Sequence, residues 1–90
     1  MIIIKDKLFQ KQLFSILKYI AQDKKTVAKK FENELNSIIR NLIHFPYKFR
    51  PSYYFEDEAY RDLVYNGYTI IYKVEKETIL ILEIFKWQER

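Results

Sequence analysis

Residues 60–90, YRDLVYNGYTIIYKVEKETILILEIFKWQER, hold the only glycine of the chain and many of its β-branched and aromatic residues. Within this stretch, Asn66-Gly67 lies between two alternating apolar runs, which is the strongest short-range signal for a β-hairpin with a two-residue type I′ turn. The pairs that such a turn places opposite one another are Tyr65 with Tyr68, Leu63 with Ile70, and Arg61 with Tyr72. Because side chains alternate across a strand, these paired residues share one face of the sheet.

A polar break at residues 75–77 separates this hairpin from a third predicted strand, residues 78–87. The register of that strand has two readings, and a shift of one residue exchanges its two faces. We choose the reading that makes the face toward the helices almost entirely apolar. The residues assigned to the core are then Leu63, Ile70, Tyr72, Leu80, Leu82 and Ile84. The alternative register would place Ile79 and Ile81 there instead. Either register gives a three-stranded antiparallel meander.

The first half of the chain predicts a short strand followed by two amphipathic helices. Residues 2–5 are β-branched and bounded by charge, and Asp6 can cap the helix that follows. The apolar stripe of the first helix is Phe9, Leu13, Ile16, Leu17 and Ile20, and that of the second is Ala28, Phe31, Leu35, Ile38 and Leu42. We expect a four-residue connection at 22–25, with Asp23 or Thr26 as the second cap, and an end before Pro46.

The remaining segment, residues 47–58, has no clean period and is expected to form an irregular connection. The predicted element order is therefore β-α-α-β-β-β, with a helical hairpin packed on one face of a small, mainly antiparallel sheet. This is an α+β fold. At 90 residues the chain has room for a single domain, residues 1–90.

Composition restricts the partners and the compartment. The chain has no cysteine, which suits a reducing cytoplasm. Its formal charge of +4 favours an acidic partner such as nucleic acid, the ribosome or an acidic protein. The apolar start, residues 1–4, ends at Lys5 and is too short for a membrane span or a signal-peptide core.

Several kinds of active site are excluded by residue counts. One glycine is too few for a phosphate-binding loop or a dinucleotide fingerprint, and one histidine without cysteine disfavours a zinc site. We therefore expect no cofactor and no metal. Glu56-Asp57-Glu58 could supply paired carboxylates for acid–base chemistry, but an exposed acidic turn is the favoured interpretation.

Basic and aromatic residues are the remaining candidates. Arg61 pairs with Tyr72 in the predicted hairpin, so it either stacks on that tyrosine or contacts a target. Lys86 lies just beyond the apolar run, where a lysine can extend to solvent along the sheet edge or bind a partner. The apolar residues expected on the sheet face opposite the helices are Val64, Ile71, Ile79, Ile81, Phe85 and Trp87. That strip predicts a covering element: either a partner protein, or residues 1–4 or the aromatic loop of the chain itself.

The chain resembles the RelE/ParE superfamily of toxins in four features. These are the element order, Pro46 after the second helix, the run Arg61-Asp62-Leu63-Val64, and YTIIYKV at 68–74 followed by 79–90. The resemblance spans essentially the whole chain, and its motifs are moderately specific. It implies the toxin half of a bacterial toxin–antitoxin pair, forming a hetero-oligomer with its antitoxin.

The superfamily has two branches that imply different activities. RelE-like members resemble ribonucleases that cut messenger RNA on the ribosome, and their pattern has an arginine where this chain has Thr69. Their pattern also extends beyond the position of Arg90. ParE-like members resemble inhibitors of DNA gyrase, and the run at 61–64 and the basic Lys86 fit their pattern better. We therefore favour a ParE-like toxin without a hydrolytic site; the alternatives are a RelE-like endoribonuclease and a non-toxic interaction module.

Within this resemblance, the residues expected to carry toxicity or target binding are Arg61, Lys86 and Arg90, followed by Lys48 and Arg50. The antitoxin is expected to be an acidic or amphipathic segment that covers apolar grooves along the helical hairpin and the sheet. The candidate antitoxin contacts are Ile71, Ile81, Phe85 and Trp87.

Overall fold

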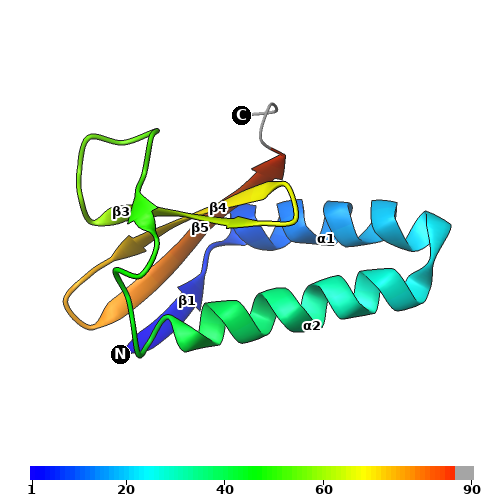
Figure 1. Cartoon of the computed structure of the whole chain (residues 1–90), viewed down its shortest axis with the longest axis horizontal. Helices are drawn as coiled ribbons and strands as arrows, with labels where there is room; N and C mark the ends of the chain where they lie inside the picture. Colours follow the sequence, from blue (N-terminus) through cyan, green and yellow to red (C-terminus); the bar gives the residue numbers. More distant parts are fainter. Residues whose placement is uncertain (87–90) are drawn as a thin grey trace.

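In the computed structural model, which describes residues 1–86, a hairpin of two helices covers one face of a five-stranded sheet (Figure 1). The elements are β1 (Ile2–Lys5), α1 (Lys7–Asp23), α2 (Lys25–Asn41), β2 (Arg50–Pro51), β3 (Tyr60–Tyr65), β4 (Tyr68–Val74) and β5 (Thr78–Lys86). The strand order is β1-β5-β4-β3-β2, with β1 parallel to β5 and the other pairs antiparallel. The predicted α+β class and the helical hairpin on a mainly antiparallel sheet are confirmed.

The β3–β4 hairpin forms as predicted. Asn66 and Gly67 have φ values of 49° and 82°, so both central residues of the turn are in the left-handed region that a type I′ turn requires. The observed register pairs Tyr65 with Tyr68, Leu63 with Ile70 and Arg61 with Tyr72. Asparagine and glycine tolerate this backbone conformation better than other residues do, which explains why the local sequence decides this register.

The predicted register of β5 is wrong for its first half, because the strand contains a β-bulge. Ile84 pairs with Ile70 and so lies on the expected face, but the next pairs are Ile71 with Glu83 and Tyr72 with Ile81. Leu82 is the extra residue, and beyond it the alternation reverses. Ile79 and Ile81 are therefore fully buried under the helices, whereas Leu80 and Leu82 are only half-buried.

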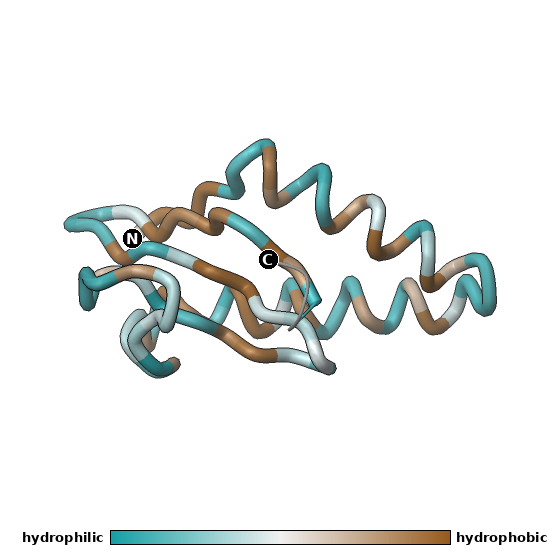
Figure 2. The backbone as a smooth tube through the Cα atoms, turned by 90° about the horizontal axis from the view of Figure 1, so that it is seen from above, coloured by the Kyte–Doolittle hydropathy of each residue, from teal (hydrophilic) through white to brown (hydrophobic). Residues whose placement is uncertain are grey.

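The two helices follow their apolar stripes with three differences from the prediction. The Asp6 carboxylate accepts a hydrogen bond from the Leu8 amide at 2.8 Å, which confirms the first cap. The connection is one residue, Lys24, and this residue caps α2 without a side-chain hydrogen bond, so neither Asp23 nor Thr26 is the cap. On α2 it is Ile39 that is fully buried, while Ile38 is half-buried. Figure 2 shows the resulting alternation of hydrophobic and hydrophilic segments along both helices.

The sheet face opposite the helices is covered in part by the aromatic segment between β2 and β3. The Tyr54 ring meets the Phe85 ring edge-on at a centroid distance of 5.4 Å, and Phe55 stacks on Tyr60 at 4.1 Å. Ile71, beneath this segment, has no exposed surface. Of the two covers that the chain itself could supply, the aromatic loop is therefore the one observed for the described residues, while β1 extends the sheet at its edge.

Candidate target-binding surface

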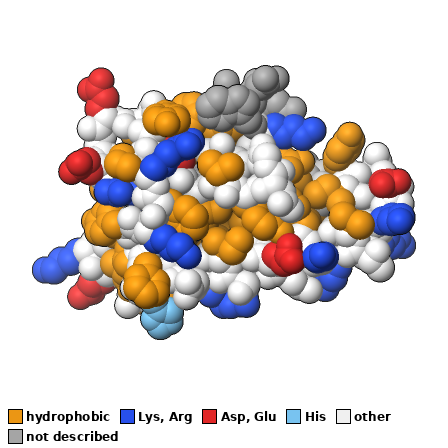
Figure 3. All heavy atoms as spheres, in the orientation of Figure 1, with side chains coloured by type: hydrophobic (Ala, Val, Ile, Leu, Met, Phe, Trp, Pro, Cys, Tyr) orange, Lys and Arg blue, Asp and Glu red, His pale blue; other side chains and the backbone are white. Residues whose placement is uncertain are grey.

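The structure separates the predicted basic residues into two regions. Lys48, Arg50 and Arg61 lie around the loop between α2 and β3, whereas Lys86 lies at the other end of the sheet, next to Tyr68 of β4. Since Arg61 and Tyr65 are four residues apart on β3, the two regions are separated by about 13 Å along the strand alone. Figure 3 shows Lys and Arg side chains interspersed with hydrophobic ones over this face of the molecule. Arg90 and Trp87 lie outside the described residues, 1–86.

Arg61, at the start of β3, forms hydrogen bonds with two backbone carbonyl groups from neighbouring loops. Its Nε donates a hydrogen bond to the Glu58 carbonyl at 2.9 Å, and its Nη1 donates to the Phe49 carbonyl at 3.2 Å. The guanidinium also lies over the Tyr47 ring, with Cζ 4.7 Å from the centroid. The predicted stack on Tyr72 is therefore replaced by one on Tyr47, a residue that sequence reasoning missed because the loop path decides it. Arg61 therefore contacts both the loop before β2 and the end of the aromatic segment that precedes β3.

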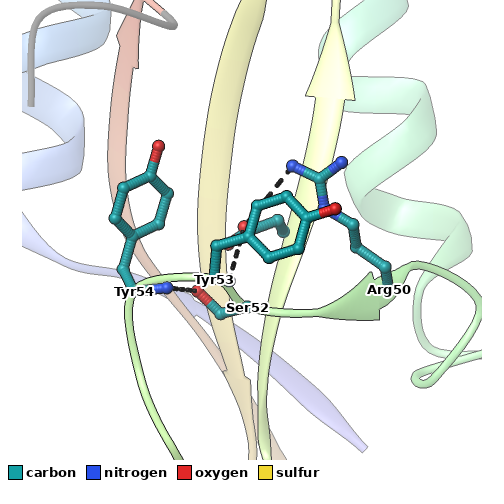
Figure 4. A network of polar contacts seen from close by, with 5 residues as sticks. Arg50, Ser52, Tyr53 and Tyr54 are labelled. Carbon is teal, nitrogen blue, oxygen red and sulfur yellow. Dashed lines mark hydrogen bonds and ion pairs between the residues drawn. The ribbon is translucent and has the colours of Figure 1, made fainter.

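Arg50 is engaged with a buried carboxylate. The Asp62 side chain is fully buried on β3, and its Oδ2 lies 3.7 Å from Nη2 of Arg50. The same Oδ2 accepts a hydrogen bond from the Tyr53 amide at 3.1 Å, and the Tyr53 ring lies 4.1 Å from the guanidinium carbon (Figure 4). Next to it, the Ser52 hydroxyl accepts from the Tyr54 amide at 3.1 Å. Burying a carboxylate without a cation is costly, so Arg50 has a structural task whatever else it binds.

Lys48 and Lys86 keep exposed ammonium groups. Lys48 lies over the ring of its neighbour Phe49, with Nζ 5.6 Å from the centroid. Lys86 lies over Tyr19 of α1, with Nζ also 5.6 Å from the ring centroid. Lys86 and Tyr19 line a pocket together with Tyr68. Exposed lysines at this distance from a ring gain little stability, which leaves their charge available to a partner. Of the described candidates, these two are the most accessible to a target.

Two tyrosines of the sheet form hydrogen bonds with α2 and with the loop after it, and both remain protonated. The Tyr72 hydroxyl donates to the Pro46 carbonyl at 2.7 Å, and burial raises the pKa of Tyr72 to about 12. The Tyr65 hydroxyl donates to Glu34 of α2, and burial together with that hydrogen bond raises the pKa of Tyr65 to about 12. At neutral pH neither phenol can act as a base; each is a hydrogen-bond donor.

Three of the four residues expected to contact an antitoxin are covered by the chain itself. Ile71 and Ile81 have no exposed surface, and 7% of Phe85 is exposed. The face assigned to Ile81 is wrong, because the bulge in β5 turns its side chain toward the helices. The large hydrophobic side chains that are exposed lie elsewhere, for example Phe14 on α1, which is 68% exposed. As antitoxin contacts, the four residues therefore remain predictions.

Thr69 and the acidic run Glu56-Asp57-Glu58 were also considered in the sequence, and the structure places both. Thr69, which stands where the nuclease pattern has arginine, is 1% exposed and lies on β4 opposite Phe85. Glu56-Asp57-Glu58 forms an exposed turn in which Asp57 accepts a hydrogen bond from the Ala59 amide at 2.9 Å. Among residues 1–86 there is no cluster of His, Asp and Glu that could hold a metal ion. Over the same residues, no helix has the length and apolar character needed to span a membrane.

A helical hairpin packed on a mainly antiparallel sheet is the fold that the resemblance to the RelE/ParE superfamily implies. The family model described as the ParE toxin of the type II toxin–antitoxin system, parDE, matches residues 3–89. The chain therefore belongs to the ParE toxin family of type II toxin–antitoxin systems.

A solved structure shows the same fold. A chain of the chromosomal ParDE TA system from P. aeruginosa is similar with a TM-score of 0.78, over 96% of this chain and 95% of that chain. The sequences are 20% identical, so this likeness concerns the fold alone. No curated protein matches the chain.

Proposed function

We propose that this toxin arrests growth by inhibiting DNA gyrase and that a cognate antitoxin neutralises it. The observation that carries the proposal is the match of the ParE toxin model to residues 3–89, because ParE-like members of the superfamily resemble gyrase inhibitors. The position of Thr69 adds support, since a buried threonine there cannot stabilise the charged phosphate of an RNA-cleavage reaction. We propose Lys86, Arg90 and Lys48 as target contacts, and Arg61 and Arg50 as basic residues that also hold the fold.

The antitoxin is proposed to be an acidic amphipathic segment. A groove of about 490 Å³ between α1 and α2 has the apolar lining residues Phe14, Leu17, Ala21 and Ala28. Lys18, Lys25 and Lys29 also line it, and Glu32 is the one acidic residue among them. Apolar side chains flanked by lysines favour a helix with one apolar face and acidic residues beside it. Of the candidates Ile71, Ile81, Phe85 and Trp87, Ile71 and Phe85 would be reached only if the antitoxin displaced the aromatic segment that covers the sheet. Ile81 faces the helices, and Trp87 lies outside the described residues.

The decisive experiment combines growth with a defined target. The chain is expressed alone and together with the neighbouring reading frame, and the purified protein is added to DNA gyrase in a supercoiling and DNA-cleavage assay. We expect arrest that the neighbouring frame relieves, and loss of supercoiling that scales with toxin concentration. Primer extension on translating ribosomes is run in parallel. Codon-specific cuts in messenger RNA, with gyrase unaffected, would replace this proposal by the RelE-like ribonuclease.

A further inference from the structure

The end of α2 and the loop that follows it enclose a cavity of about 390 Å³. Its polar lining consists of Ser37, Arg40, Asn41, His44 and Lys48. Arg40, His44 and Lys48 are each four residues apart, and no described residue that lines the cavity is an Asp or Glu. A cavity with two permanent cations, an imidazole, a hydroxyl and an amide supplies hydrogen-bond donors to an anion, and nothing in its lining repels one.

An open, apolar surface depression adjoins this cavity and shares His44 and Lys48 with it. Phe45, Pro46 and Tyr47 supply its other walls. The side chains of Phe45 and Tyr47 are 60% and 55% exposed, so both rings are accessible to a ligand. An anion-binding cavity beside two exposed rings matches the two parts of a nucleotide, a charged phosphate and a planar base.

The loop that carries these residues is anchored to the rest of the molecule. Leu42 is buried in the core, the Pro46 carbonyl accepts the Tyr72 hydroxyl at 2.7 Å, and the Phe49 carbonyl accepts Nη1 of Arg61 at 3.2 Å. Within the loop, the Lys48 amide donates to the Phe45 carbonyl at 3.1 Å. Because the backbone is held at these points, the cavity exists before a ligand binds, and little conformational entropy is lost on binding.

A purely structural explanation covers only part of this arrangement. The carboxyl end of a helix carries partial negative charge, which stabilises cations such as Arg40 and His44 there without any ligand. That effect falls off within the last turn. It accounts neither for Lys48, which lies seven residues beyond the end of α2, nor for the exposed rings of Phe45 and Tyr47.

We propose that this surface binds single-stranded nucleic acid, with backbone phosphates at Arg40, His44 and Lys48 and a base stacked on Phe45 or Tyr47. Aromatic rings stack on any base, so the surface selects a strand with accessible bases over a closed duplex and carries no base code. The proposal goes beyond the inhibition of gyrase, because it concerns a direct contact between the toxin itself and nucleic acid. It also gives Lys48 a specific role among the basic residues of the chain.

The test measures the affinity of the purified full chain for fluorescent oligo-dT and oligo-U strands by anisotropy over a range of salt concentrations. We expect Arg40→Gln/Lys48→Gln to weaken binding about ten-fold at low salt. Because each neutralised phosphate contributes about 0.7 to the salt dependence of single-strand binding, the logarithmic slope should fall by about 1.4. Phe45→Ser should weaken binding about ten-fold without changing that slope, since stacking releases no counterions.

The matched control is Lys24→Gln/Lys30→Gln, which removes the same charge from two exposed positions, one between the helices and one in α2. It should change the affinity less than about two-fold, and all variants should keep the thermal midpoint of the parent chain. Equal losses in the control and the cavity variant would show binding by net charge only and overturn the proposal. So would failure of both strands to bind at low salt, a duplex bound as tightly as a strand, or an acidic peptide that binds the cavity while the strands do not. Gyrase inhibition is scored separately, so it can survive when this proposal fails.

Discussion

Arg61 and Lys86 illustrate how two residues of one predicted basic surface differ once their contacts are known. Arg61 makes two hydrogen bonds to carbonyl groups and stacks on a tyrosine, so its charge is used inside the chain. Lys86 is exposed, and its ammonium group lies over the ring of Tyr19. That both residues are basic could be read from the sequence. The contacts of Arg61 could not, because residues 47 and 49 come from a loop without a period.

These contacts predict different effects of the two alanine variants. Arg61→Ala leaves two carbonyl groups without their donor, which should lower the free energy of unfolding by about 1–3 kcal/mol. In a domain of this size each 1 kcal/mol moves the thermal midpoint by about 4–8 °C. Lys86→Ala should leave the midpoint unchanged and relieve growth arrest. Thermal melts and growth curves are compared for both; full toxicity of Lys86→Ala at a normal midpoint would remove Lys86 from the target surface.

The buried Tyr72 and the half-buried Tyr65 predict a loss of stability in alkali. The pKa of each is about 12 in the folded chain against an ordinary value of 10.0, so the folded state holds these protons where the unfolded state releases them. Their contribution is therefore complete below pH 10 and is lost as the pH rises from about 10 to about 12. Urea unfolding across this window should show a steeper decline for the parent chain than for Tyr65→Phe/Tyr72→Phe. Parallel declines would mean that these hydroxyls do not couple to folding.

At the scale of elements, the hairpin of β3 and β4 and the bulge of β5 show what sequence can and cannot decide. Asn66-Gly67 specifies its turn through backbone conformation, so the register of β3 against β4 could be predicted residue by residue. In β5, apolar residues occupy consecutive positions, and a chain that can bury either alternate set gives no local signal for an extra residue. The bulge lets Ile84 face the helices at one end of the strand and Ile79 and Ile81 at the other.

The bulge leads to a direct comparison of neighbouring residues. Ile81→Ala removes a fully buried side chain and should lower the free energy of unfolding by about 2–5 kcal/mol. Leu80→Ala removes a half-buried side chain on the other face and should cost less, about 1 kcal/mol. Both are measured by urea unfolding with a common slope. A larger effect of the Leu80 variant would restore the register predicted from alternation.

At the scale of the whole molecule, the helical hairpin carries the positive charge of the chain. Its basic residues are Lys7, Lys11, Lys18, Lys24, Lys25, Lys29, Lys30 and Arg40, and its acidic residues are Asp23, Glu32 and Glu34. The hairpin also extends past the end of the sheet, which exposes this charge on several sides (Figure 1). Such a distribution steers an acidic partner toward the helices by long-range attraction that salt weakens.

The position of each basic candidate residue could be predicted where its contacts come from regular elements, and not where they come from loops. The candidate Lys86, on a strand, could be placed from the sequence. The cavity that joins Arg40 and His44 to Lys48 could not be predicted from their spacing of four residues. His44 and Lys48 lie beyond the helix, so helical geometry does not place them beside Arg40. The cover over the sheet likewise depended on how residues 52–60 fold back, a path that no periodic pattern specifies.

The pairing of β1 with β5 has a consequence for the order of folding events. Ile2 lies beside Thr78 across a separation of 76 residues, whereas the two turns of the meander and the helical connection close over a few residues each. Long loops close slowly and at a higher entropic cost, so the edge strand should join after the rate-limiting barrier is crossed. Substituting valine for Ile3, which packs against the core, should therefore accelerate unfolding and leave the refolding rate nearly constant in stopped-flow chevron measurements. A refolding rate that falls in step with stability would instead place this strand in the nucleus.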